Sequence, residues 1–471
     1  MIFSSSVFLF LFLPMVLLGY FLIRVEYRNI FLLIVSLAFY GWGEPRFIFV
    51  MCLSIGINYI AGLIIHYGKM NCGKVCNRII LICAVMVNLI ILFYFKYLDF
   101  FIESINTVTG SAFPLKNIVL PIGISFFTFQ GMSYILDLYM DKVEVQKKLI
   151  NIALYIALFP QLIAGPIVRY KDINEQINFR ECKLDKFVIG IRRFVVGLGK
   201  KVVIANNLGL IADQIFANNP LENSMAIAWL GIICYTIQIY FDFSGYSDMA
   251  IGLGKMFGFD FLENFNYPYI STSITEFWRR WHISLSSWFR DYVYIPLGGN
   301  RRGNMYFNLL VVFLVTGLWH GAAWNFVIWG LWHGMFLIIE KMTKQKNIHF
   351  KMPKSIKWLF TMIIVMIGWI LFRAPSLKFA VEYVGVMFGA LGVKQSIVNL
   401  GWYLSPFIII VLGIALIGAM NFKRIFNGMN EQLEGTYLKE GLINIYIIVL
   451  FLICIVCVMT STYNPFIYFR F

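Results

Sequence analysis

The chain has 471 residues, of which 60 % are apolar and 18 % aromatic, while Lys, Arg, Asp and Glu together make up only 13 %. Soluble domains carry about 25 % charged residues, so this composition excludes a soluble globular protein and a disordered one. The apolar residues form runs of about 15 to 20, which are typical of membrane-spanning helices and not of the alternating strands of a membrane barrel. The composition therefore predicts an all-α polytopic membrane protein.

The formal charge of +15 does not indicate a nucleic-acid partner. In a membrane protein, Lys and Arg collect on cytoplasmic loops, where they contact anionic membrane lipid. The eight cysteines lie mostly inside apolar runs and predict no disulfide framework. His66, Cys72 and Cys76 have no fourth ligand nearby, so no metal site is expected there.

In chain order, the first apolar run covers Val7 to Ile23, and we expect it to be a retained span because no cleavage site follows it. Further helices are expected in the other apolar runs, which are Phe31 to Tyr40, Phe47 to Ile65, Ile79 to Phe95, Ile118 to Leu138, Ile152 to Leu162, Phe187 to Ile215, Met225 to Phe241, Tyr306 to Leu318, Trp324 to Ile339, Trp358 to Phe372, Phe379 to Leu391, Tyr403 to Met420 and Ile443 to Met459. Short runs are more often re-entrant, so we expect about eleven full spans and a few partial ones. No soluble domain can be separated, and residues 1–471 are predicted to form a single integral-membrane domain.

The distribution of lysines predicts the orientation. The stretch from Lys341 to Lys357 contains six lysines and no acidic residue. Such a loop is expected to be cytoplasmic. The stretch from Lys69 to Arg78 is likewise expected to be cytoplasmic. Arg24 and Arg28 after the first span predict an N-terminus outside the cytoplasm.

The stretch from Ser273 to Asp291 is predicted to be one amphipathic helix. Its apolar residues recur at steps of three and four, Ser273 and Glu276 have the spacing of a capping box, and Glu276 with Arg280 forms an i,i+4 pair. The charges and the tryptophans favour a helix lying along or partly within the membrane, with His282 directed into the protein. The alternative is an interfacial helix that only contacts lipid head groups.

His320 directly follows the uncharged run from Phe307 to Trp319. If this run is a membrane helix, His320 lies deep in the membrane or near the end of that helix. A neutral imidazole near its titration range suits a general base; the alternative is a histidine satisfied by a backbone carbonyl between packed helices. His333 follows 13 residues later, which is about 220° around one ideal helix, so both could be central only if the helix breaks between them. Each of the two lies in a GLWHG sequence.

Embedded carboxylates are a further polar feature. Asp137, Asp242 and Asp248 are expected to be helix caps or partners of Arg169, Arg192 or Arg193 across a break in the helix. The alternative is a direct part in catalysis. The sequence contains no phosphate-binding loop, no G-x-S-x-G elbow and no HExxH motif, so an ATPase, an α/β-hydrolase and a zinc protease are not indicated. The residues themselves leave an enzyme and a proton-coupled transporter equally open.

Several longer motifs carry a family resemblance that runs nearly end to end. They are Pro121 to Phe127, Gly165 to Ile167, Phe241 to Asp248, Glu276 to Tyr292 (EFWRRWHISLSSWFRDY), Pro296 to Gly299, Thr316 to Gly334 (TGLWHGAAWNFVIWGLWHG) and the closing Phe466 to Phe469. With these motifs the sequence resembles the membrane-bound O-acyltransferases, and among them the bacterial branch that O-acetylates alginate and other polysaccharides or peptidoglycan.

The resemblance implies a helical core around a tunnel and assigns roles to three histidines. The catalytic histidine of the WHG motif corresponds to His320, and the RWH motif corresponds to His282, which would orient the acceptor or donate to the oxyanion. The two imidazoles are then expected to share one cavity, within about 10 Å of each other. His333 matches the second WHG motif and is the secondary candidate. Arg192, Arg193, Lys200 and Lys201 are candidates for attracting the phosphates of the acyl donor.

The implied activity is transfer of acetyl from cytoplasmic acetyl-CoA, across the bacterial cytoplasmic membrane, to an extracytoplasmic hydroxyl. A thioester is already activated, so no permanently bound cofactor and no metal is expected. The implied partner is a separate extracytoplasmic, serine-esterase-like acetyltransferase. The alternatives are the D-alanyl transferase of teichoic acid synthesis and, from another class, a proton-coupled transporter or flippase.

Overall fold

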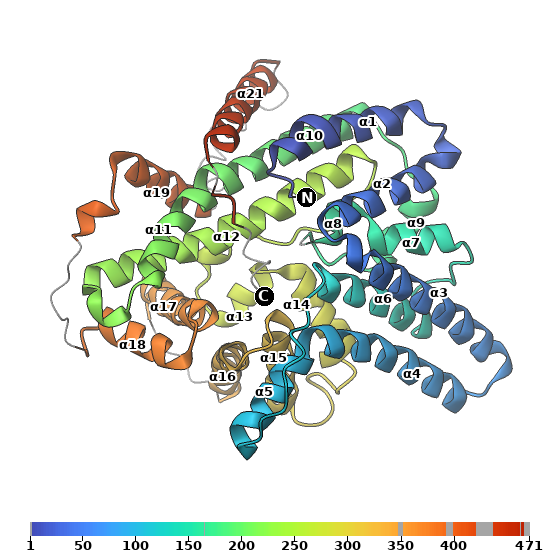
Figure 1. Ribbon diagram of the computed structural model, residues 1–471, viewed down its shortest axis with the longest axis horizontal. Helices are drawn as coiled ribbons and strands as arrows, with labels where there is room; N and C mark the ends of the chain where they lie inside the picture. The colour runs from blue at the N-terminus through green and yellow to red at the C-terminus, as the bar shows by residue number, and fades with distance from the viewer. Residues whose placement is uncertain are drawn as a thin grey trace. The chain divides into compact units, whose positions relative to one another are not determined.

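The computed structural model describes most of the chain, namely residues 2–163, 165–346, 352–391, 399–420, 437–461 and 463–465. Within these ranges the regular secondary structure is helical, without a β-strand (Figure 1). The predicted all-helical class is therefore confirmed. The closing motif from Phe466 to Phe469 lies outside the described residues, as does part of the lysine-rich stretch from Lys341 to Lys357.

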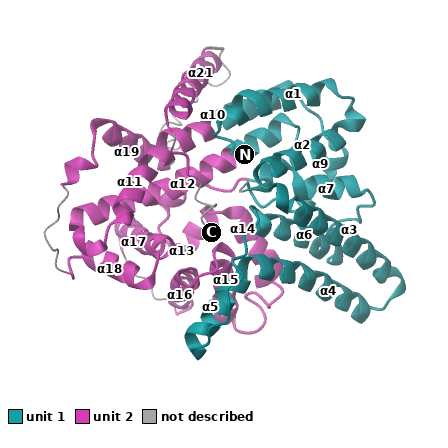
Figure 2. Cartoon of the chain, viewed as in Figure 1, with its two compact units in different colours: residues 1–194, 249–262 teal, residues 195–248, 263–471 magenta. Residues whose placement is uncertain are grey.

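The chain divides into two compact units, which Figure 2 colours separately: residues 1–194 with 249–262, and residues 195–248 with 263–471. The first unit contains η1 (Phe8–Phe12), α1 (Leu13–Leu22), η2 (Val25–Tyr27), α2 (Arg28–Gly43), η3 (Pro45–Phe47), α3 (Ile48–Asn71), α4 (Lys74–Leu92), η4 (Phe93–Tyr97), α5 (Leu98–Thr109), α6 (Ile124–Tyr139), α7 (Leu149–Ala157), α8 (Phe159–Leu162), α9 (Tyr170–Asn178) and the first part of α10 (Leu184–Gly199).

Interhelical polar contacts and small residues hold this first unit together. The buried side chains of Asn58 on α3 and Asn88 on α4 exchange hydrogen bonds of 3.0 and 3.2 Å, a contact typical of helices packed in a membrane.

The apolar run predicted to start at Ile118 becomes helical only at Ile124, because Pro121 and the left-handed Gly123 (φ 76°) precede the helix.

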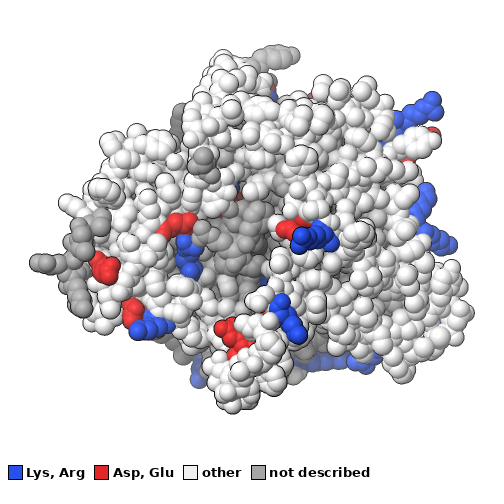
Figure 3. All heavy atoms as spheres, in the orientation of Figure 1, with Lys and Arg blue, Asp and Glu red and all other residues white. Residues whose placement is uncertain are grey.

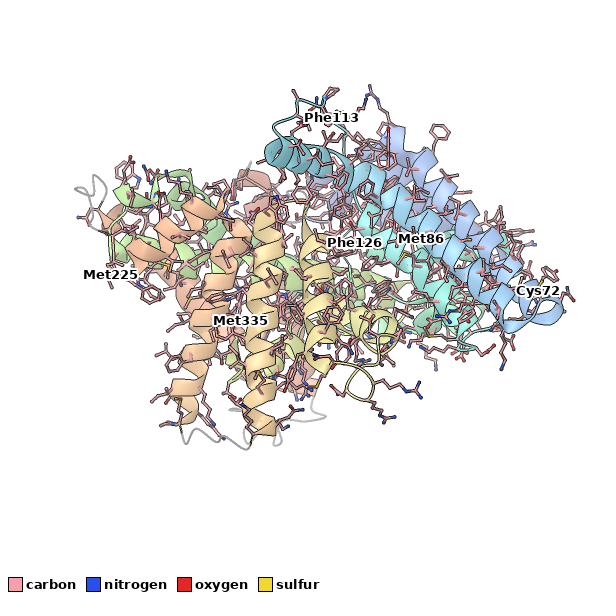
Figure 4. The ribbon with its side chains drawn as sticks, turned by 90° about the horizontal axis from the view of Figure 1, so that it is seen from below. Cys72, Met86, Phe113, Phe126, Met225 and Met335 are labelled. Atoms are coloured by element: carbon pink, nitrogen blue, oxygen red, sulfur yellow. The ribbon has the colours of Figure 1, made fainter. Side chains whose placement is uncertain are left out.

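The second unit contains η5 (Lys200–Ala205), α11 (Asn206–Ala217), η6 (Pro220–Glu222), most of α12 (Met225–Met256), η7 (Pro268–Ile270), α13 (Ile274–Arg280), α14 (Ile283–Phe289), η8 (Arg290–Tyr294), α15 (Met305–His320), α16 (Trp324–Gln345), α17 (Lys354–Arg373), α18 (Leu377–Met387), η9 (Leu400–Trp402), α19 (Pro406–Ala419) and α21 (Tyr437–Thr460). Figure 4, which labels Met335 on α16, shows α16 beside α17.

Among the described residues, five helical segments are long and apolar enough to cross a membrane. They are Pro45–Asn71, Lys74–Thr109, Met225–Met256, Lys354–Arg373 and Leu438–Thr460. Three shorter apolar helices accompany them, at Phe8–Leu22, Met305–His320 and Pro406–Ala419. On the face drawn in Figure 3, charged side chains are few and most of the surface is uncharged. Such a surface is expected where lipid, and not water, is the solvent.

Two glycines bring α15 and α16 into close contact. A Cβ atom on Gly317 would lie 2.3 Å from the carbonyl oxygen of Phe326, and one on Gly330 would lie 2.3 Å from the carbonyl oxygen of Phe313. The same Cβ atoms would lie 3.4 Å from the Cα of the other glycine. Packing thus explains the first glycine of each GLWHG copy, since these two glycines face each other.

Gly330→Ala is expected to destabilise the protein by about 2 kcal/mol or more, because the clash is with backbone, which cannot rotate away. Thermal unfolding of the purified protein in detergent measures the effect. Gly413→Ala, on α19, is the matched control, because a Cβ there meets nothing within 4 Å. Equal melting temperatures for the two variants would contradict the proposed contact between α15 and α16.

Candidate active site

The stretch predicted as one helix from Ser273 to Asp291 is broken in the structure. Helix α13 ends at Arg280 and α14 begins at Ile283, and the residues between them leave the helical conformation. His282 adopts a left-handed backbone conformation, with φ 42° and ψ 54°. The prediction of a single helix was therefore wrong. A left-handed conformation at a residue other than glycine costs about 1 to 3 kcal/mol and is typical of functional sites.

The start of α13 has the predicted Ser273 cap but not the full capping box, because the Glu276 carboxylate accepts from the backbone N–H of Thr272. The Ser273 hydroxyl accepts a hydrogen bond of 3.0 Å from the backbone N–H of Glu276, and Glu276 forms an ion pair of 3.0 Å with Arg280. In addition, the carboxylate of Glu340 on α16 accepts a 2.6 Å hydrogen bond from the backbone N–H of Ile274. The start of α13 is thus held in place relative to α16.

Hydrogen bonds around Asn264 determine which nitrogen of His282 carries a proton. The Asn264 side-chain oxygen accepts from the backbone N–H of Ser284 at 3.1 Å, and its Nδ2 donates to Ser247 at 3.1 Å. The atom that faces His282 Nδ1, at 3.2 Å, is therefore the carbonyl oxygen. Because an oxygen can only accept, Nδ1 of His282 carries the hydrogen and Nε2 is the basic nitrogen.

His282 is completely buried, and its Nε2 has no hydrogen-bond partner among the described residues. Burial, together with the neighbouring His320, holds the pKa of His282 well below its usual value near 6.5. The imidazole is therefore neutral at physiological pH, with an unprotonated nitrogen.

His282 and His320 come together from separate elements. His320 is the last residue of α15, and its ring centroid lies 6.5 Å from that of His282. Both side chains are buried. The prediction that the two imidazoles lie within about 10 Å is confirmed, a separation that suits two groups acting on one reacting centre.

Aromatic rings surround His320. The rings of Trp319, Trp329 and Phe372 lie 5.0 to 5.3 Å from its ring. His333 is also buried, and its ring lies 5.2 Å from that of Trp329, which therefore contacts both histidines. The helix does break between His320 and His333, so the two are not restricted to opposite faces of one helix.

The lysines proposed for donor binding have partners on α12. Lys201 forms a buried ion pair of 2.7 Å with Asp242, and Lys200 one of 2.6 Å with Asp248. Helix α12 is continuous through both aspartates, so the break expected there is absent. Gly245 between the aspartates permits the approach, since a Cβ would lie 2.8 Å from the carbonyl oxygen of Gly197.

The other two donor-binding candidates, Arg192 and Arg193, lie half-buried on α10 in the first unit.

Sequence reasoning missed Asn264, which lies 18 residues before His282 in a segment without helical periodicity. Its polar side chain between Glu263 and Phe265 gave no signal of a partner so far along the chain.

Comparison with known proteins identifies the family. Residues 123–379 match MBOAT, the membrane-bound O-acyltransferase family. The chain is 44 % identical over 498 aligned positions, covering all of both chains, to "Probable alginate O-acetylase AlgI" of Pseudomonas putida. It is 38 % identical to "Peptidoglycan O-acetyltransferase" of Helicobacter pylori, over 84 % of this chain and 81 % of that protein. It is 28 % identical to "Teichoic acid D-alanyltransferase" of Bacillus subtilis, over 75 % and 91 %. The chain therefore belongs to the membrane-bound O-acyltransferase family and is a multi-pass membrane O-acyltransferase.

Proposed function

We propose that the protein transfers acetyl from acetyl-CoA to a hydroxyl of a cell-surface polysaccharide of the alginate kind, with peptidoglycan as the second candidate acceptor. The observation that carries this proposal is the pair of buried imidazoles, 6.5 Å apart, in a chain 44 % identical to a probable alginate O-acetylase. The identity of 28 % to a D-alanyltransferase makes D-alanyl transfer the less supported alternative.

In the proposed mechanism, His320 is the general base. It removes the proton from the acceptor hydroxyl while the hydroxyl oxygen attacks the thioester carbonyl of acetyl-CoA. The tetrahedral intermediate then collapses, the carbon–sulfur bond breaks, and His320 returns the proton to the departing thiolate. The products are the acetyl ester and free CoA, so neither a metal nor ATP enters the balance.

His282 is proposed to orient the acceptor. Of the two roles expected for it, donation to the oxyanion would require a proton on Nε2. The hydrogen bond from Nδ1 to Asn264 favours the other role, because it leaves Nε2 free to accept a hydrogen bond from a neighbouring hydroxyl of the acceptor sugar, while the attacking hydroxyl gives its proton to His320. Asn264 is then a positioning residue that fixes both the tautomer and the direction of the ring.

The remaining site residues receive weaker assignments. His333 is proposed to support His320 through Trp329, which contacts both rings. Arg192, Arg193 and Lys200 remain candidates for attracting the phosphates of CoA. The burial of Lys201 and its ion pair with Asp242 favour a structural role for this lysine.

We propose that the two units form one acyltransferase domain with a tunnel that admits acetyl-CoA from the cytoplasm of a bacterial cell. With the five long segments, the three shorter apolar helices give up to eight candidate spans among the described residues, fewer than the eleven expected. Helix α15, with 16 residues, is about 24 Å long, slightly less than the hydrocarbon thickness of a bilayer. An extracytoplasmic, serine-esterase-like acetyltransferase is the proposed partner that receives the acetyl group.

Turnover by the purified full-length chain tests the proposed activity. The protein in detergent, given acetyl-CoA labelled in the acetyl group and an alginate oligosaccharide, is expected to release CoA and to transfer or hydrolyse the label. A D-alanyl carrier thioester, supplied in place of acetyl-CoA, is the control donor. Turnover of the D-alanyl thioester alone would overturn the acetyl assignment and support the alternative.

The orientation is tested by cysteine labelling. In a background with the native cysteines replaced, Lys346→Cys and the restored Cys72 are expected to resist an impermeant thiol reagent added outside intact cells. Phe113→Cys is the matched control and is expected to be labelled, because residues 72 and 113 lie at opposite ends of the helical segment Lys74–Thr109 (Figure 4). Ready labelling of Lys346→Cys from outside would invert the orientation and the side from which acetyl-CoA enters.

A further inference from the structure

An enclosed space lies beside His320 and has no role in the mechanism above. Its volume is about 10 Å³. It is lined by His320 and by six apolar or aromatic side chains, which are Ile239, Phe243, Trp281, Trp329, Trp369 and Phe372. All of these side chains are buried. The space is therefore an interior cavity that opens on the imidazole proposed to act as the base.

The cavity has the size of one small group. On this measure of volume, about 10 to 15 Å³ corresponds to a single water-sized sphere, and a methyl group is of similar size. A water molecule would need two to four polar partners. Apart from the imidazole of His320 and the indole N–H groups of the three tryptophans, the walls are aliphatic and aromatic, so the surface offered to a small group is mostly apolar and suits a methyl group.

The walls of the cavity support one another and leave little room to expand. The ring of Trp369 lies 4.8 Å from that of Trp281 and 6.3 Å from that of Trp329, and the ring of Phe372 lies 5.3 Å from that of Trp329. Large aromatic side chains packed in this way have few alternative rotamers. A longer acyl chain would have to displace at least one of these rings.

We propose that this cavity holds the methyl group of the acetyl donor during transfer, and that its walls restrict the enzyme to short acyl thioesters. The inference rests on the proposed acetyl transfer at His320 and adds the acyl specificity of that site. Ile239 is the specificity-determining wall residue that is easiest to shorten, since it is aliphatic and comes from α12. One methylene more or less in an apolar pocket changes kcat/KM by about 10- to 200-fold.

The test compares acyl donors of increasing length on the full-length protein in detergent. Release of CoA from acetyl-, propionyl- and butyryl-CoA gives kcat/KM for each donor. The unmodified protein is expected to favour acetyl-CoA over butyryl-CoA by at least about tenfold. Ile239→Ala removes wall atoms and is expected to raise the ratio of butyryl to acetyl turnover by about tenfold or more.

Ile237→Ala is the matched control. Ile237 and Ile239 lie on the same helix and are each 4 % exposed, but Ile237 does not line the cavity. The control is expected to leave the donor ratio unchanged. Phe372→Leu opens a different wall from α17 and is expected to shift the ratio in the same direction, so the test does not depend on the folding of one variant.

The outcomes separate this inference from the proposed function. If acetyl-CoA is turned over and the unmodified protein uses butyryl-CoA equally well, the cavity does not select the acyl group, while acetyl transfer stands. An unchanged ratio in both folded wall variants, or the same shift in Ile237→Ala, also overturns the role of the cavity alone. Absence of any acetyl-CoA turnover by the unmodified protein overturns the proposed function and the inference together.

Discussion

His320→Ala is expected to lower acetyl transfer by about 10² to 10⁴-fold, the usual contribution of a general base. The side chain is buried in an aromatic environment that alanine leaves in place, so the variant is expected to insert into the membrane and to purify like the unmodified protein. Acetyl transfer per folded molecule, with folding checked by size-exclusion chromatography in detergent, measures the effect.

The other histidines are the controls for this result. His66→Ala, on α3, removes an imidazole outside the candidate site and is expected to retain full activity. His333→Ala is expected to be milder than His320→Ala, because the ring of His333 contacts Trp329, which in turn contacts His320. Retention of more than about a tenth of the activity by His320→Ala would remove it from the role of base. A larger loss in His333→Ala would show that the second WHG motif carries the base.

His282→Ala is expected to lower transfer by about 10²-fold or more, since a hydroxyl misplaced by about 1 Å reacts that much more slowly. The role of its hydrogen-bond partner has a sharper signature. Asn264→Asp places a carboxylate next to Nδ1, which stabilises the imidazolium and raises the pKa of His282. Protonation of His282 then begins at higher pH, so the acidic limb of the pH–rate profile is expected to move to higher pH.

Asn325→Asp is the matched control for the pH profile. Asn325 lies on α16 in the same unit and donates to the carbonyl oxygen of Ala374 at 2.9 Å. Its replacement is expected to leave the acidic limb in place. A merely structural role for Asn264 would lower activity at all pH values without moving the limb, and this outcome would contradict its proposed role as the positioning partner of His282.

Much of the fold class and the centre of the candidate site could be predicted from sequence. Long apolar runs exclude water as the surrounding solvent whatever the tertiary structure, so the helical membrane class followed from composition. Local signals were also sufficient where the contact is local. The cap at Ser273 and the pair of Glu276 with Arg280 join residues three and four positions apart, and both are present. The histidines could be singled out because placing an ionisable side chain within a membrane segment costs free energy, so such residues are rare there unless they have a function.

The tertiary structure decided what depends on contacts between distant residues. The period of apolar residues from Ser273 to Asp291 fits one helix, and contacts from outside that stretch, such as those of Asn264 and Asn266, support the left-handed break at His282. Likewise, arginines were predicted as partners of Asp242 and Asp248, whereas close packing at Gly245 brings lysines to both. Local propensity is fixed by neighbours in the chain, but a buried polar group is satisfied by whichever group packing brings within hydrogen-bond distance.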